Sequence, residues 1–176
     1  MPELKSVTLG PLTAADSDVM FRWINDRATV ESNSAYRPAH RSAHDAWFKS
    51  VQARCDLVIF AIRESASERL VGTCQLFDIQ PVHRHAELQI RIGNEDDRGK
   101  GYGGTALREL TAFGFGSLNL HRIMLRVFGS NERAIASYVK AGFVTEGRQR
   151  EAVWISSRWE DVVTMGLLRR DWERTS

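Results

Sequence analysis

Apolar and polar residues alternate in several stretches of the chain, a period of two that is typical of strands with one buried face. The clearest stretch, residues 86–93 (AELQIRIG), sets three apolar side chains against three polar ones: Leu88, Ile90 and Ile92 against Glu87, Gln89 and Arg91. Residues 57–63 and 70–77 are apolar runs separated by a polar ESASE turn, which predicts an antiparallel hairpin. Two further strands are predicted at residues 4–9 and 122–128.

Two helices are predicted between the first strand and the hairpin. Thr13 followed by Asp16 resembles a capping box and opens the first helix. Ser42 with Asp45 repeats the pattern before the second helix. Residues 31–41, which lie between these helices, are predicted to form a loop.

Two more helices and a strand pair are predicted in the second half of the chain. Residues 105–113 carry apolar side chains on one side, as a helix packed against a sheet does. Residues 131–143 form the other helix, with Gly142 just beyond its C-terminal cap. The tail, residues 143–168, predicts two strands joined by a turn at residues 156–157.

The order of these elements indicates the fold class. One strand, two helices and three strands are followed by a helix, a strand, a helix and a strand pair, with no repeat or linker between them. Residues 1–176 are therefore predicted to form a single α/β (α+β) domain, with a mostly antiparallel mixed sheet and helices on its faces.

The composition excludes several classes of protein. The 176 residues include 43% hydrophobic and 26% charged residues, with a net charge of +2 and no Lys/Arg run, so no nucleic-acid partner is expected. Cys55 and Cys74 are too few for a disulfide framework. The start of the chain does not read as a signal peptide, and no apolar run approaches the ~18 residues of a membrane helix. We expect a cytoplasmic protein without a membrane partner.

The candidate chemistry begins at residues 94–104 (NEDDRGKGYGG), where four of the last six residues are glycine. Gly99, Gly101 and Gly104 match the dinucleotide-binding pattern G-x-G-x-x-G. That site also needs an acidic residue about 20 positions further on, and none occurs between Glu109 and Glu132. The phosphate loop of nucleoside triphosphatases fails as well, because its glycine spacing and its Ser/Thr are absent.

We therefore interpret the glycine stretch as a loop of exposed backbone N–H groups that connects a strand to a helix. The N-terminus of a helix, predicted here at about Gly104, carries partial positive charge and unpaired donors. Arg98 adds a full positive charge and Lys100 adds a second. Such a site suits two linked phosphates. The alternative is a tight turn without a ligand.

The second candidate segment is the helix at residues 131–143. Asn131, Ala134, Ile135 and Tyr138 share one helical face. Ala and Ile suit ordinary core contacts, whereas Asn and Tyr need hydrogen-bond partners if they are buried. Taken alone, the helix is better explained by an Asn N-cap and a Tyr bonded within the core than by a ligand site.

Together the two segments resemble the GNAT superfamily of acyl-CoA-dependent N-acetyltransferases. They read Arg98-x-x-Gly101-x-Gly103, a helix, a strand, and then Asn131-x-x-Ala134-x-x-x-Tyr138-x-x-x-Gly142-Phe143. The resemblance covers the chain from about Leu70 to its end, and the order of the earlier elements agrees. It is strongest to the branch with ribosomal-protein N-terminal, spermidine and nucleotide amino-sugar acetyltransferases.

This resemblance implies that acetyl-CoA binds in a cleft between two splayed strands, residues 86–93 and 122–128. The pyrophosphate would lie on the backbone N–H groups of Arg98, Gly99, Lys100, Gly101, Tyr102, Gly103 and Gly104. Asn131 would contact the pantetheine arm, which would pair, as an added strand would, with the backbone of Ile90, Arg91 and Ile92. No metal is implied.

The implied reaction is direct attack of a primary amine on the thioester in a ternary complex. Tyr138 would protonate the leaving thiolate, and a backbone N–H near Ile90 would bind the oxyanion. Since an alkylammonium group has a pKa near 10, a base must remove a proton. Glu87 is the candidate base, directly or through a water relay. His83 and His85 are weaker candidates for a proton relay.

The acceptor is predicted less closely than the donor. Cations outnumber acids over residues 22–49, which favours an acceptor with phosphate or carboxylate groups. An amino sugar linked to a nucleotide is the first expectation, a protein N-terminus the second and a polyamine the third. An acyl-CoA sensor or interaction module is the non-catalytic alternative. A monomer or homodimer is expected.

Overall fold

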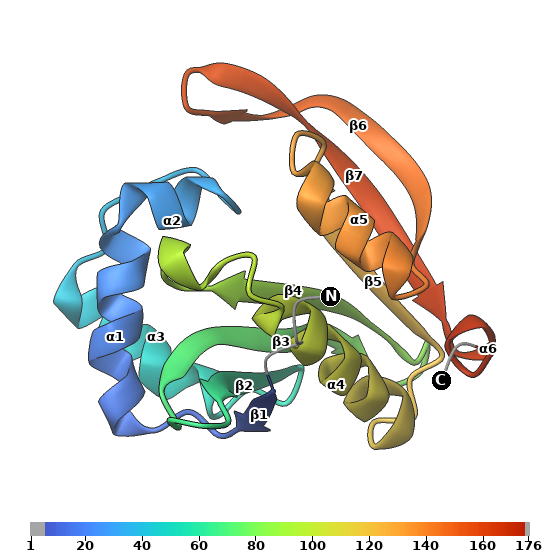
Figure 1. Ribbon diagram of the computed structural model, residues 1–176, viewed down its shortest axis with the longest axis horizontal. Coiled ribbons are helices and arrows are strands. Elements are labelled where there is room, and N and C mark those ends of the chain that lie inside the picture. Colours follow the sequence, from blue (N-terminus) through green and yellow to red (C-terminus); the bar gives the residue numbers. More distant parts are fainter. Residues whose placement is uncertain (1–5, 175–176) are drawn as a thin grey trace.

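The computed structural model describes residues 6–174, which form one seven-stranded sheet with helices on both faces (Figure 1). The strand order is β1-β2-β3-β4-β5-β7-β6, and every neighbouring pair is antiparallel except β4 and β5. The strands are β1 (Val7–Gly10), β2 (Leu57–Glu64), β3 (Leu70–Gln80), β4 (His85–Ile92), β5 (Arg122–Phe128), β6 (Val144–Ile155) and β7 (Arg158–Leu168).

Short helices connect the strands and cover the sheet. They are α1 (Ala14–Asn25), α2 (Arg27–Glu31), α3 (Arg41–Val51), the 3₁₀ helix η1 (Glu95–Asp97), α4 (Tyr102–Gly116), α5 (Glu132–Lys140) and α6 (Arg169–Trp172). None of those within residues 6–174 is long and apolar enough to cross a membrane.

Two successive residues of β2 show how the core is divided. Ala61 packs in a cluster with side chains of α1 and α3, whereas Ile62 packs in the main cluster with α4. Because successive strand residues point to opposite faces, α1 and α3 cover one face of the sheet and α4 covers the other. Both side chains are fully buried. The α/β prediction, with helices on both faces, is confirmed.

The parallel pair β4 and β5 stays together only at its start. The pairing runs from His85 with Arg122 to Glu87 with Met124 and then stops, although both strands continue. Figure 1 shows β4 with β1–β3, and β5 with β6 and β7, diverging from this short contact. The splayed strands that the resemblance implied are therefore present.

Several local predictions agree with the structure. The hairpin of β2 and β3 and the strand pair of β6 and β7 are both antiparallel. The Asp16 carboxylate accepts a hydrogen bond from the Thr13 backbone N–H at 2.7 Å, as in a capping box. The first strand is observed as Val7–Gly10, and residues 4 and 5 lie outside the described residues.

The second predicted capping box is wrong. Helix α3 begins one residue before Ser42, with His40 as its N-cap. Asp45 forms an ion pair with Arg41 at 2.9 Å, one helical turn away, instead of capping the helix. The loop predicted at residues 31–41 begins one residue later than expected, because a helix that was not predicted, α2, ends at Glu31. The Asp26 side chain caps α2 by accepting from the Thr29 N–H.

The end of α5 follows the predicted form. Gly142 has a φ of 92°, and its N–H donates to the Val139 carbonyl while the Phe143 N–H donates to the Tyr138 carbonyl. These two bonds define a Schellman motif, and the Tyr138 and Phe143 rings pack 5.9 Å apart as its apolar contact. Gly142 therefore ends α5 and turns the chain into β6.

We expect Gly142→Ala to lower the free energy of unfolding by about 1 kcal/mol, because a side chain is strained at this positive φ. Urea denaturation would measure the change. Gly116→Ala is the matched control: Gly116 lies in α4, and a Cβ there meets no atom within 4 Å. That control should be neutral or stabilising, and equal losses in both variants would contradict the strain at Gly142.

Candidate active site

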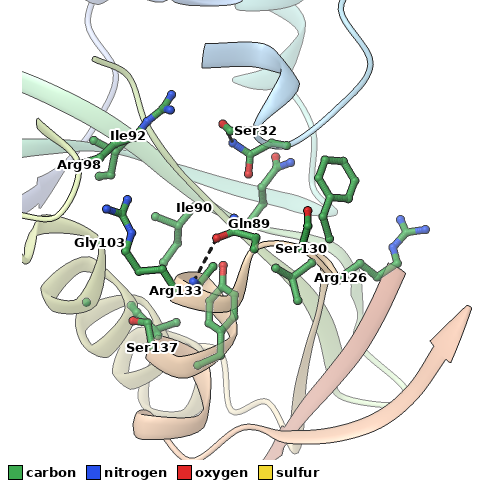
Figure 2. Close-up of a pocket in the computed structure, with 18 of the residues that line it drawn as sticks. Ser32, Gln89, Ile90, Ile92, Arg98, Gly103, Arg126, Ser130, Arg133 and Ser137 are labelled. Carbon is green, nitrogen blue, oxygen red and sulfur yellow. Dashed lines mark hydrogen bonds between the residues drawn. The ribbon is translucent and has the colours of Figure 1, made fainter. Parts of the chain in front are cut away.

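A cleft of about 1020 Å³ opens where β4 and β5 diverge. Its walls come from β4, the glycine turn, the start of α4, the end of β5, α5 and the hairpin of β6 and β7. Figure 2 shows Ile90 and Gln89 of β4 between Ser32, which follows α2, and Ser137 of α5. The cleft thus brings together the two sequence segments, residues 94–104 and 131–143, that carried the family resemblance.

The glycine turn needs two of its glycines for the path of the backbone. Gly99 and Gly101 have φ angles of 81° and 91°, which side chains rarely adopt. Gly101 is the N-cap of α4, and its carbonyl accepts from the Thr105 N–H at 3.1 Å. The helix therefore begins at Tyr102, two residues before the predicted start at Gly104.

Gly103 and Gly104 have a different role from the turn glycines. They lie in the first turn of α4, and a Cβ added at Gly103 meets only Ile92, at 3.9 Å. At Gly104 it approaches only the Ser137 hydroxyl, at 4.0 Å. Both residues line the cleft. Their missing side chains leave space beside the unpaired N–H groups of a helix N-terminus, where a phosphate fits.

Two arginines, one in the glycine turn and one in α5, line the cleft and add positive charge to it. Arg98 lines the cleft, and its buried Nη2 has no hydrogen-bond partner within residues 6–174. Arg133 of α5 also lines the cleft, and its Nη1 lies 3.3 Å from the position of a Cβ at Gly99. A buried donor without a partner is costly, so an anion in the cleft would satisfy Arg98. The donor set therefore fits a diphosphate.

A buried network holds the chain just before the glycine turn. Asp97 is 4% exposed and accepts two hydrogen bonds from Arg69, at 2.7 and 2.9 Å. Hydrogen bonding by Arg69 lowers the pKa of Asp97 to about 2. Asn94 links the network to α1, because it accepts from the Trp23 indole N–H at 3.0 Å and donates to Asp97 at 3.3 Å. The turn is thereby fixed both to α1 and to the residue just before β3.

Two residues predicted in the phosphate site have side chains engaged in this scaffold. The Lys100 ammonium lies 3.6 Å from Asp97, and Lys100 is not among the described residues that line the cleft. Tyr102 lines the cleft, but its side chain is buried and its hydroxyl donates to Glu64. The backbone groups of these residues are therefore the part that the predicted phosphate site uses.

The edge of β4 that faces the opening is the predicted pantetheine surface. Beyond Glu87, β4 has no pairing with β5 in the described sheet, so its backbone is available on that side. Ile90 and Ile92 line the cleft and pack against the main core. The Arg91 side chain lies on the other face of β4, in a different cavity.

Helix α5 supplies Asn131 and Tyr138, and both line the cleft. The side-chain oxygen of Asn131 accepts a hydrogen bond from the Ala134 N–H at 3.2 Å, so Asn131 is the N-cap of α5. Its side-chain NH₂ group is then left for a ligand. Burial raises the pKa of the Tyr138 phenol to about 12. Its hydroxyl therefore keeps its proton at neutral pH and is able to donate it.

Three carboxylates that lie outside the glycine turn also line the cleft, on Glu31, Glu87 and Glu160, together with Arg126 and Arg158. Glu87 accepts from Arg126 at 2.9 Å, and Glu160 pairs with Arg158 at 3.0 Å. These pairs hold the carboxylates of Glu87 and Glu160 in the wall.

The cation excess counted over residues 22–49 is partly neutralised by ion pairs. Arg41 pairs with Asp18 at 2.6 Å and with Asp45 at 2.9 Å, and Arg27 lies 3.6 Å from Glu31. An excess counted along the chain is therefore a poor guide to the charge of the cleft.

The sequence interpretation missed several residues of the cleft. Arg133 and Ser137 are one helical turn apart, on the part of α5 that faces the glycine turn, and this spacing was an available signal. The place of Glu160 in the cleft could not be inferred from the sequence, because it depends on the pairing of β7 with β6. His83 and His85 stack on each other, with ring centroids 6.0 Å apart, and neither is among the described residues that line the cleft.

The sequence comparisons identify a family. The profile of the Acetyltransferase (GNAT) domain matches residues 6–144. A spermidine N(1)-acetyltransferase of Escherichia coli K12 is 30% identical, over 98% of this chain and 91% of its own length. A spermidine N(1)-acetyltransferase of Vibrio cholerae is 39% identical over 60% of this chain; the match spans 61% of that enzyme's own length.

A solved structure agrees with the sequence matches. The crystal structure of spermidine N-acetyltransferase from Vibrio cholerae in complex with CoA and spermine superimposes with a TM-score of 0.87. It is 27% identical, and the match covers 95% of this chain and 98% of that one. The similarity therefore extends over both halves of the cleft.

Proposed function

The chain belongs to the GNAT acetyltransferase family and is an acetyl-CoA-dependent N-acetyltransferase, and from this premise we propose that its acceptor is a primary amine of a polyamine such as spermidine. The observation that carries the choice of acceptor is the similarity to spermidine acetyltransferases, and the cleft wall adds three carboxylates, Glu31, Glu87 and Glu160, each beside an arginine. An ammonium group of a polycation is able to pair with such a carboxylate beside its arginine or in place of it.

The relatives support this acceptor over the one that the sequence favoured first. The matched enzymes named above act on spermidine, and one solved neighbour contains spermine. The amino-sugar expectation depended on a local excess of cations, part of which is paired with acids on α1, α2 and α3. That expectation has less support than the polyamine proposal.

For the donor, we propose that the start of α4 and the arginines of the glycine turn and of α5 hold the diphosphate. Acetyl-CoA supplies the activated acetyl group. The N–H groups of Gly103 and Gly104 and the Arg98 side chain bind and orient the phosphates. The free edge of β4 at Ile90–Ile92 and the Asn131 amide hold the pantetheine arm. Two observations support a diphosphate at this place: the open space at Gly103 and Gly104, and the Arg98 Nη2, which has no hydrogen-bond partner among the described residues.

Proton transfer is proposed at two side chains. Glu87, positioned by its hydrogen bond with Arg126, accepts the proton of the acceptor amine through a water molecule. Tyr138 donates its phenolic proton to the sulfur as the thiolate leaves. Backbone N–H groups near Ile90 stabilise the negative charge on the carbonyl oxygen.

The acceptor proposal is tested by a thiol-release assay with a panel of amines. We expect kcat/KM for spermidine to exceed that for a nucleotide-linked amino sugar and for a ribosomal-protein N-terminal peptide by about 100-fold or more. Glu160→Gln should raise the KM for spermidine about tenfold, because it removes a charge from the wall. Glu109→Gln is the matched control, an exposed residue of α4 that is not among the described lining residues.

Better turnover of the amino sugar or of the peptide would overturn the polyamine proposal. An equal effect of the two Glu→Gln changes would show that the wall charge does not select the acceptor.

For Tyr138→Phe, we expect a fall in kcat of about 100-fold with little change in the KM for spermidine, because the phenol acts when the thiolate leaves. Since the pKa of Tyr138 is about 12, the phenol stays protonated up to about pH 11. The ratio of wild-type to variant kcat should therefore be constant from pH 7 to 10. An unchanged kcat would refute the proposed acid.

Gly103→Val should abolish or strongly weaken acetyl-CoA binding in isothermal titration, because the added side chain fills the space beside the helix N-terminus. The protein itself has room for a Cβ there, so the fold should persist. Gly116→Val, near the other end of α4, also has open space and should bind normally. Unaltered binding by Gly103→Val would contradict the proposed phosphate site.

A further inference from the structure

A second cavity, of about 450 Å³, lies between the sheet and the helices α1 and α3. Most of its wall is apolar, and it includes Met20, Ile24, Trp47, Val51, Leu57 and Ile59. Its size is within the range of small-molecule sites. The exposed Trp47 side chain leaves 39% of its surface open to solvent, although it lies next to this cavity.

Two polar groups in this wall have unsatisfied atoms. The Nε of Arg91 and the Nδ1 of His44 are buried, and neither has a hydrogen-bond partner within residues 6–174. The His44 Nε2 lies 2.9 Å from the Ser17 carbonyl, so that side of the ring is occupied. Buried polar atoms of this kind are uncommon in native proteins, and each calls for an explanation.

The charges around the cavity have one sign. Arg91 and Arg54 are cations, and no Asp or Glu is among the described residues that line it. Arg54 pairs with Asp56 outside the cavity at 2.6 Å, whereas Arg91 has no recorded ion pair in the described chain. Burial lowers the pKa of Arg91. A buried guanidinium without a counterion is costly, and a carboxylate is the group that relieves this cost.

We propose that this cavity binds a small monocarboxylate with an aromatic body, whose carboxylate is held by the Arg91 guanidinium. The apolar wall and Trp47 contact the aromatic body, and the carboxylate lies at the sheet. The two arginines exclude a polycation, so this ligand is not the polyamine. Gln89 and Phe77 line both cavities, so the site adjoins the acetyl-transfer cleft.

The probe is 3-phenylpropionate, with its neutral amide as the matched ligand. Both are titrated into the full chain without acetyl-CoA or amine, and binding is followed by calorimetry and by tryptophan fluorescence. We expect the carboxylate to bind about tenfold more tightly than the amide or better, because a charged hydrogen bond is lost in the amide. Absence of binding at millimolar carboxylate would overturn the proposal.

Arg91→Met tests the charge while the side chain stays long and apolar. The variant should bind the acid and the amide equally, and its thermal unfolding midpoint should not fall, because a buried unpaired charge is removed. If Arg91→Met keeps the preference for the carboxylate, the proposed contact is wrong.

Ala43→Leu tests the location. Ala43 is an exposed residue of α3 that lines the cavity, so a larger side chain narrows it without disturbing the core. It should weaken binding of both ligands. Ala46→Leu, on the same helix but not among the described lining residues, should bind as the wild type does. Equal behaviour of the two variants would place the ligand elsewhere. These titrations use no acceptor, so they are independent of the polyamine proposal.

Discussion

The divergence of β4 from β5 is the constraint on which the rest of the site depends. The two strands pair over only three residues each, and beyond Glu87 the backbone of β4 is left without its neighbour on that side. In an ordinary sheet such a free edge is a liability. Here it is one wall of a cleft, with the start of α4 and the inner face of α5 beside it. An extended ligand that pairs with this edge replaces the missing strand.

The anion site is built from residues that lie far apart in the sequence. Gly99 and Gly101 give the turn its path, but Arg69, just before β3, and Trp23 on α1 fix the turn in place through Asp97 and Asn94. The position of the α4 terminus is therefore set by buried hydrogen bonds, so the donors stay oriented without a ligand. Such preorganisation lowers the entropic cost of binding.

The two cavities beside β4 differ in charge although Glu87 and Arg91 lie on the same face of the strand, because the two residues meet different elements along its length: Glu87 pairs with Arg126 of β5, and Arg91 lies under α1 and α3. Glu87 contributes to the cleft that carries carboxylates, whereas Arg91 lies in the cavity under α1 and α3, which has no acid among its described lining residues. Gln89 is hydrogen-bonded to Gln75 at 2.8 Å and lines both. One strand thus separates two sites with preferences for opposite charges.

The sequence by itself determined what depends on neighbours along the chain: the alternation of β4, the glycine turn, and the Asn131 and Gly142 caps of α5. It also carried the family resemblance. Tertiary structure alone decided which charges remain unpaired, because Arg41 and Lys100 meet acids in the fold while the buried Arg98 Nη2 and Arg91 Nε do not. Local geometry is fixed by bonds and hydrogen bonds over a few residues. The charge of a cleft is a sum over segments that only folding brings together.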